Sequence, residues 1–164
     1  QPKPNGEWQF PEGRRLGERI PGLRLVLAPR HTERVREVAS AIEARGGRCI
    51  TRVERDQAIP RGDAVILVAT MGELGRIYSV ADVVFVGGSL IPHGGQNMME
   101  PAGLGKAVVF GPYVDNFRES VDLLLRDVAA IQLSDESELV QTLGDLLSDA
   151  SNCLRRGLVR FGFC

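Results

Sequence analysis

The feature that most constrains the fold is an alternation of short, continuously apolar runs with longer amphipathic segments. Two of these runs, Val83–Val86 and Ala107–Phe110, contain only hydrophobic residues. Strands that are buried on both faces show this pattern, whereas strands with one solvated face alternate apolar and polar residues. The sequence therefore predicts an α/β fold, a Rossmann-like three-layer sandwich with a mostly parallel sheet of about six strands.

The expected elements follow one another along most of the chain. The expected strands are Leu23–Ala28, Cys49–Val53, Ala64–Ala69, Val83–Val86, Ala107–Phe110 and Ala129–Leu133. The expected helices are a segment from Thr32 to the Gly46-Gly47 stop, Gly72–Asp82, Asn97–Leu104, Asn116–Asp127 and Asp135–Ser148. Thr32 and Ser134 precede two of these helices, so we expect their hydroxyls to act as N-caps.

The chain is expected to form one folded unit with two irregular ends. Its length of 164 residues suits a single sizeable core. The prolines of QPKPNGEWQFPEG argue against regular structure at the start. We therefore predict an irregular leader or linker over residues 1–22, a folded domain over 23–150 and a tail over 151–164.

Composition excludes several classes of function. A net charge of -1, from 20 basic and 21 acidic residues, provides no field for nucleic acid, so no nucleic-acid partner is expected. Cys49, Cys153 and Cys164 lie far apart, which indicates neither a disulfide framework nor a structural zinc site and favours a reducing, cytosolic compartment. Because no apolar run approaches the roughly 20 residues that span a bilayer, the fragment is expected to be soluble.

Loops at the carboxyl ends of parallel strands are where such sheets bind ligands. Four loops qualify: residues 28–31, residues 70–73, the stretch 87–106, and residues 110–113. The loop at 28–31 places Arg30 directly after a strand, where a guanidinium suits an anion or is simply solvated. In the loop at 70–73, Gly72 permits close approach of a ligand to the backbone, and Glu73 suits the first turn of a helix.

The stretch GGSLIPHGGQNMMEPAGLGK, residues 87–106, contains six glycines and few functional side chains. Its glycines allow backbone amides to face a phosphate before the next helix begins. Asn97 and Glu100 stand three residues apart on one helical face, where an amide and a carboxylate suit the hydroxyls of a sugar. A lone loop histidine such as His93 is more often a hydrogen-bonding or surface residue than a general acid. Neither GxGxxG nor GxxxxGK[ST] occurs, which disfavours dinucleotide and P-loop binding.

Several of these segments together resemble a known family. They are Pro29-Arg30-His31, Thr70–Leu74, Ala81-Asp82, FVGGSLIPHGGQNMMEPAGLGKAVVFGP and Asn116–Glu119. In this order they resemble the carboxyl-terminal, donor-binding domain of a 3-deoxy-D-manno-octulosonic acid (Kdo) transferase, over roughly residues 23 to 148. The resemblance implies one half of a GT-B glycosyltransferase, which transfers Kdo from CMP-Kdo to a lipid A precursor in lipopolysaccharide biosynthesis.

The resemblance also implies a donor site. The corresponding positions are Pro29, Arg30, Met71, Gly72, Glu73, Asn97, Met98, Met99 and Glu100. Gly87, Gly88, Ser89 and His93 are expected to line the cleft. Arg30 would pair with the phosphate of CMP, the Gly72 backbone and Glu73 would hold the cytidine end, and Asn97 with Glu100 would fix the ribose and orient the leaving group.

The resemblance further implies no metal and no cofactor, because arginine and helix N-termini can stabilise departing CMP. The partners would be CMP-Kdo or CMP, an amino-terminal acceptor domain, and a lipid A precursor bound through that domain. The acceptor domain, which carries the general base, does not form part of this sequence, so we expect no catalytic residue here and no transfer by this fragment alone. The full-length protein would work at the cytoplasmic face of the bacterial inner membrane.

Some residues depart from the family pattern and leave other functions open. Over residues 93–100 the family usually has HGGHNPLE, whereas this chain has HGGQNMME, so Gln96 replaces a histidine and Met98-Met99 replaces Pro-Leu. The family also usually has Asp at the position of Ala69. Gln96 cannot transfer a proton near neutral pH. The alternatives are a GT-B donor domain for another nucleotide sugar, and a non-catalytic nucleotide-binding module. The acceptor, the number of sugars transferred, the oligomeric state and the role of the tail stay open.

Overall fold

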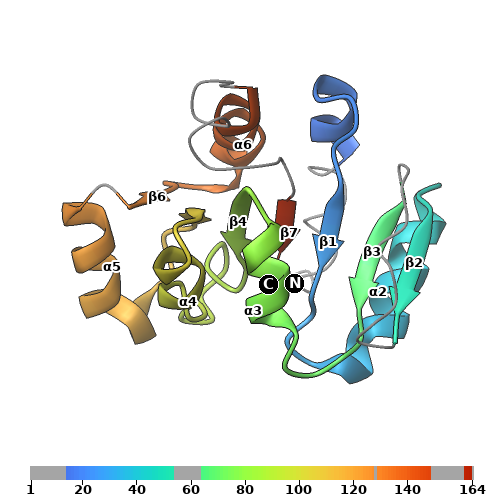
Figure 1. Cartoon of the computed structure of the whole chain (residues 1–164), viewed down its shortest axis with the longest axis horizontal. Helices are drawn as coiled ribbons and strands as arrows, with labels where there is room; N and C mark the ends of the chain where they lie inside the picture. The colour runs from blue at the N-terminus through green and yellow to red at the C-terminus, as the bar shows by residue number, and fades with distance from the viewer. Residues whose placement is uncertain (1–13, 54–63, 128, 149–160, 164) are drawn as a thin grey trace.

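The computed structural model of the chain describes residues 14–53, 64–127, 129–148 and 161–163. These residues form one parallel sheet in the order β2-β3-β1-β7-β4-β5-β6 (Figure 1). The strands are β1 (Leu25–Leu27), β2 (Cys49–Arg52), β3 (Val65–Val68), β4 (Val83–Val86), β5 (Ala107–Phe110), β6 (Ala130–Gln132) and β7 (Phe161–Phe163).

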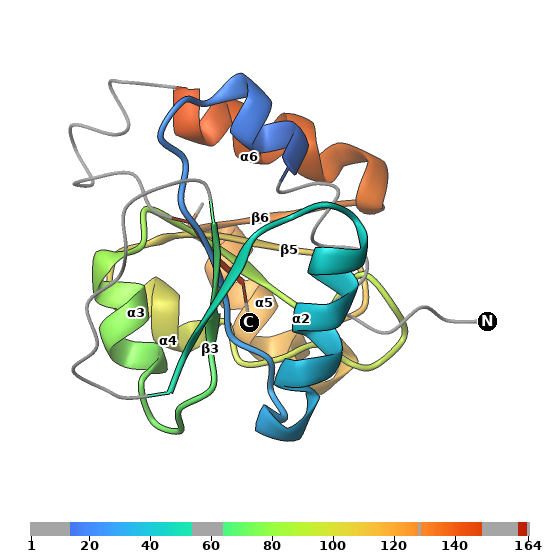
Figure 2. The same cartoon turned by 90° about the vertical axis from the view of Figure 1, so that its right-hand side faces the viewer.

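Helices lie on both faces of this sheet (Figure 2). They are α2 (Val35–Ala44), α3 (Leu74–Val80), α4 (Met99–Gly103), α5 (Arg118–Arg126) and α6 (Leu139–Ser148), with short 3-10 turns η1 (Thr32–Arg34), η2 (Asp115–Phe117) and η3 (Glu136–Glu138). A further short helix covers residues 14–19.

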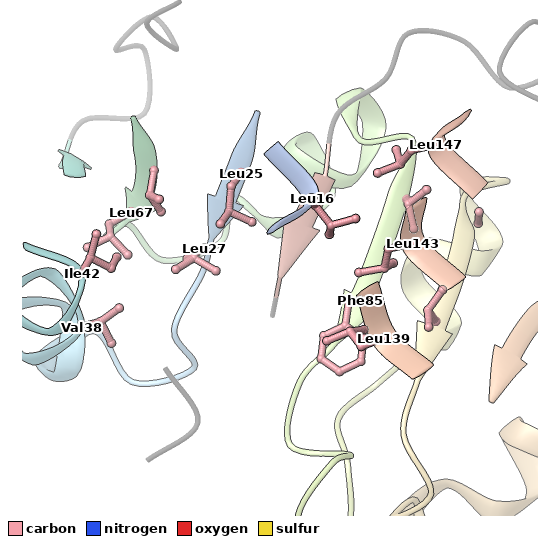
Figure 3. Packing of buried hydrophobic residues seen from close by; sticks show 14 of the residues in the cluster. Leu16, Leu25, Leu27, Val38, Ile42, Leu67, Phe85, Leu139, Leu143 and Leu147 are labelled. Carbon is pink, nitrogen blue, oxygen red and sulfur yellow. The ribbon is translucent and has the colours of Figure 1, made fainter. Parts of the chain in front are cut away.

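The expected three-layer sandwich is confirmed by the way side chains alternate along the central strands. In β4, Val83 and Phe85 join the core cluster that packs under α2 and α6, whereas Val84 and Val86 join the cluster under α3 and α5. Figure 3 shows Phe85 beside Leu139 of α6. Because both faces of each strand are buried, a continuous apolar run is what the sheet requires.

The expected strands are all present, and their bounds differ from prediction by at most two residues at either end. The seventh strand, β7, lies between β1 and β4 in the middle of the sheet, within the segment that the sequence assigned to a tail. Its three residues are too short to produce a recognisable apolar period, which explains why the pattern did not predict it. The division of the chain into a domain over 23–150 and a tail stays a prediction.

The start of the chain is more ordered than an irregular leader through residue 22. Residues 14–19 are helical, and Leu16 is fully buried in the core cluster that contains Leu143 of α6 (Figure 3). The Arg19 guanidinium lies over Gly144 so closely that a Cβ at position 144 would stand 2.7 Å from Arg19 Nη1. The described part of the leader therefore packs on α6, while residues 1–13 lie outside the described residues.

Both expected N-caps are wrong. Thr32 is the first residue of η1, and His31, which precedes it, makes no side-chain cap hydrogen bond. At η3 the cap is Asp135, whose carboxylate accepts a hydrogen bond from the Ser137 amide at 2.7 Å. Ser134 instead donates its backbone amide to Glu138 Oε2 at 2.8 Å. A carboxylate satisfies a free helix amide as well as a hydroxyl does, so neighbouring Ser and Asp compete for the same role.

Candidate functional site

The predicted site segments follow the ends of strands that run in one direction. Residues 28–31 follow β1, residues 69–73 follow β3, residues 87–98 follow β4 and residues 111–114 follow β5. Since every pairing in the sheet is parallel, these loops all emerge at the same edge. The fold therefore brings segments that are more than eighty positions apart in the sequence together at the carboxyl edge of the sheet.

The loop after β3 is built around the buried carboxylate of Glu73. Only 1% of the Glu73 side chain is exposed, and Arg52 Nη2 lies 3.1 Å from its Oε1, a contact of charges rather than an aligned hydrogen bond. The Thr70 hydroxyl donates to the other oxygen, Oε2. At the tip of the loop, Met71 is exposed and Gly72 has a φ of 75°, a conformation that favours glycine. Glu73 thus faces the protein, and Met71 with Gly72 forms the outer surface of the loop.

The segment 97–100 begins α4 and approaches this same loop. Asn97 Oδ1 accepts a hydrogen bond from the Met99 amide at 3.0 Å, so the asparagine side chain forms a turn that leads into α4. Met98 is fully buried in the core cluster, whereas Glu100 is exposed. A Cβ placed on Gly75 would lie 3.5 Å from Glu100 Oε1, which puts that carboxylate against the first turn of α3. The structure therefore brings Glu100 next to the helix that Glu73 precedes.

The glycine-rich segment after β4 is fastened to the loop after β5. Ser89 is fully buried; its hydroxyl donates to the Val86 carbonyl at 2.6 Å and accepts from the Gly111 amide at 2.8 Å. Gly94 has a φ of 80°, and the Asn116 side chain occupies the space where a Cβ would be. The expectation that Ser89 lines a cleft is at odds with this burial, because its hydroxyl serves to join two loops.

The other predicted residues lie at the surface of the same edge. Arg30 is exposed after β1, the strand that pairs with β3, and Pro29 before it is half-buried. His93 is exposed, whereas Gly87 is buried and Gly88 is half-buried. Met99 packs partly against the core beside Met98. These residues share the edge, and the contact between Glu100 and the Gly75 position joins the segments around Glu73 and Glu100.

Sequence reasoning missed Arg52 and gave no role to Thr70 and Asn116. Arg52 ends β2, a half-buried edge strand, and an arginine at the carboxyl end of a strand is a signal that was available. Its partner Glu73 lies on the next strand's loop, and only the parallel pairing of β2 with β3 brings the two together.

Two further features of the described residues bear on metals and membranes. Within residues 14–53, 64–127, 129–148 and 161–163, no group of three or more His, Cys, Asp or Glu side chains is placed to hold a metal ion. No helix in these ranges is long and apolar enough to cross a membrane. The absence of a metal from the reaction stays a prediction.

Comparison with curated proteins gives a consistent set of relatives. The chain is 31% identical over 144 residues to a 3-deoxy-D-manno-octulosonic acid transferase of Haemophilus influenzae. The matched region is 87% of this chain and 33% of that protein. It is 32% identical over 128 residues to the Aquifex aeolicus protein of the same name, covering 77% of this chain and 34% of that protein. The chain is a homologue of these Kdo transferases. No family model matches it.

A solved structure supports the fold of this Kdo transferase homologue. The C-terminal CMP-Kdo binding domain of WaaA from Acinetobacter baumannii matches with a TM-score of 0.72 and 24% sequence identity, over 89% of this chain and 92% of that chain. The fold is thus that of one half of a GT-B protein, as expected. The chain spans about a third of the length of the Kdo transferases that it matches, so the activity of the whole protein is a matter for proposal.

Proposed function

We propose that the carboxyl edge of this sheet binds CMP-Kdo, and that the chain is the donor-binding part of a Kdo transferase. One observation carries the proposal: the segments that resemble the family all lie at the carboxyl ends of parallel strands, at one edge of the sheet. At this edge the Glu100 carboxylate lies against the first turn of α3, the helix that Glu73 precedes. Homology to Kdo transferases over 87% of the chain supports the same donor.

Five of the predicted residues have roles that suit their positions. Arg30, exposed after β1, pairs with the single phosphate of CMP through charge-assisted hydrogen bonds. The backbone of Gly72, at the outer surface of its loop, holds the cytidine end, and Glu73 supports it from the buried side. Asn97 and Glu100 take the ribose hydroxyls: the Asn97 oxygen caps the Met99 amide, which leaves the amide nitrogen as the donor to the sugar.

In transfer, CMP leaves with a developing negative charge on its phosphate. A guanidinium that is already in place lowers the free energy of that charge without reorganising during the reaction. Arg30 supplies this stabilisation for the leaving group. In the full-length protein, an amino-terminal domain would hold the lipid A precursor at the cytoplasmic face of the bacterial inner membrane, and the group that activates its hydroxyl would come from that domain.

Isothermal titration tests the proposal on the chain as it stands. CMP should bind with a Kd at least about tenfold lower than those of UDP and GDP, because the loop after β3 would recognise the base. The whole-protein activity is tested with full-length protein, CMP-Kdo and a lipid A precursor. No binding of CMP would refute the donor assignment and favour a module that keeps the fold without the ligand.

A second donor is worth testing because of one relative. A protein of Fusobacterium nucleatum named as a bifunctional glycosyltransferase/methyltransferase is 30% identical over 127 residues, 77% of this chain and 20% of that protein. That name specifies no Kdo. If UDP or GDP binds more tightly than CMP, the chain is a donor domain for another nucleotide sugar, and Ala69 and Gln96 are the first positions to exchange.

A further inference from the structure

Arg52 joins the end of one strand to the loop of the next in two ways. Its carbonyl accepts a hydrogen bond from the Ala69 amide at 2.9 Å, directly after β3. Its guanidinium Nη2 lies 3.1 Å from Oε1 of Glu73, four residues further along that loop. Arg52 therefore contacts both the first residue of the loop, through the backbone, and the last, through the side chain.

The ion pair between Arg52 and Glu73 is shielded from water. The Arg52 side chain is 12% exposed and the Glu73 side chain 1% exposed. A carboxylate removed from water in this way needs a compensating charge, and loss of one partner of such a pair costs far more than loss of both. Arg52 therefore places a positive charge beside the buried carboxylate of Glu73.

Glu73 in turn fixes the shape of the loop. The Thr70 hydroxyl donates to Glu73 Oε2, so the carboxylate ties the first part of the loop to its last residue. Between these points Met71 is 70% exposed and Gly72 adopts a φ of 75°. The carboxylate oxygens point to protein groups, so the surface that the loop offers to a ligand is formed by Met71 and Gly72.

We propose that Arg52 is a positioning residue for the donor nucleotide. Through Glu73 it holds residues 70–73 in the one conformation in which the Gly72 backbone binds the cytidine end. This inference rests on the proposed function, since it concerns the same nucleotide. Arg52 touches neither phosphate nor base, and its effect on affinity comes from ordering the loop before the nucleotide arrives.

The test measures the affinity of the 164-residue chain for cytidine and for CMP by isothermal titration. Arg52→Met should weaken the binding of both ligands by the same factor, about tenfold, because the loop must then be ordered on binding. Arg52→Met combined with Glu73→Gln should lose less than Arg52→Met alone, because no charge is left buried without a partner. Arg34→Met is the matched control: it removes the exposed Arg34–Glu37 pair and should leave both affinities unchanged.

A spectroscopic measurement separates positioning from a general structural role. In the ligand-free protein, Arg52→Met should shift the backbone amide signals of Met71 and Gly72, whereas a variant that only lowers stability leaves them in place while the protein is folded. If Arg52→Met does not fold, the combined variant with Glu73→Gln carries the test and should still bind cytidine more weakly than the Arg34→Met control does.

The outcomes distinguish this inference from the function on which it rests. Failure of the unaltered chain to bind cytidine and CMP refutes the proposed function, and the inference with it. A second outcome refutes only the inference: the unaltered chain binds normally, and Arg52→Met or the combined variant binds cytidine with undiminished affinity. A loss confined to CMP would also overturn it, because that result places Arg52 at the phosphate.

Discussion

Replacement of Glu100 by glutamine separates a ligand contact from a structural carboxylate, because the two side chains have almost the same size. Glu100 is exposed in the first turn of α4, and its Oε1 lies 3.5 Å from the position of a Cβ on Gly75. No hydrophobic contact is lost in the exchange. The cost to stability is limited to the interaction of an exposed charge with the helix dipole, about 0.3 to 1 kcal/mol.

The cost to binding should be larger. A carboxylate that accepts hydrogen bonds from ribose hydroxyls contributes about 1 to 3 kcal/mol, which corresponds to roughly 5- to 150-fold in the Kd for CMP. Glu119→Gln is a matched control, because Glu119 is also exposed in the first turn of a helix, α5. We expect Glu100→Gln to weaken CMP binding within that range, and Glu119→Gln to leave it unchanged.

Isothermal titration and thermal melting of the same samples provide the measurement. The ligand assignment requires reduced affinity with a nearly unchanged melting temperature, since the partner of the carboxylate exists only in the complex. Unchanged CMP affinity together with a lowered melting temperature would refute the reasoning, because it would show that Glu100 only supports the start of α4. The assignment of the segment 97–100 to the donor site would then be withdrawn.

Three other perturbations test separate parts of the account. Arg30→Ala should weaken CMP binding by about 1.5 to 3 kcal/mol and leave cytidine binding unchanged; equal losses for both ligands would make Arg30 structural. Gly94→Ala should lower the free energy of unfolding by about 1 to 3 kcal/mol in urea titrations. It should do so more than Gly105→Ala, which has a similar φ but open space around it, and equal effects would exclude a role for the Asn116 contact. Burial, together with the nearby charge of Glu43, raises the pKa of the Cys49 thiol to about 11. In a chain whose other two cysteines are replaced by serine, alkylation of Cys49 at pH 8 should therefore be about 100-fold slower than alkylation of a free thiol. Rapid alkylation at pH 8 would contradict the buried position of the Cys49 thiol. Because the pKa is raised in the folded state, the free energy of unfolding should also fall as the pH rises towards 11.

The sequence predicts those parts of the fold that depend on local patterns. The bounds of β4 and β5 match the expected runs at both ends, because a strand buried on both faces must be apolar throughout. The central strand β7 has no such pattern, and its place between β1 and β4 depends on pairing with residues more than seventy positions away. Asp135 rather than Ser134 caps η3, because the choice between adjacent capping residues depends on backbone geometry.

The candidate site shows the same division. Loops after parallel strands are placed at one edge by topology alone, so Arg30, Gly72 and Glu100 could be grouped from the sequence. The environment of each side chain could not, because it depends on packing across the sheet: Met98 is buried in the core, Ser89 joins two loops, and Glu73 faces Arg52. Burial of these side chains is a property of the assembled layers, which a linear pattern does not contain.

Amide chemical shifts of the isotope-labelled chain during titration with CMP test the central claim most directly. The account predicts shifts at Arg30, at residues 71–73 and within residues 87–100, all at the carboxyl edge of the sheet. It predicts no change along α6, which packs against the opposite side of the sheet from α3 and α5. Shifts centred on α6, or no shifts at saturating CMP, would contradict the assignment of this edge as the donor site.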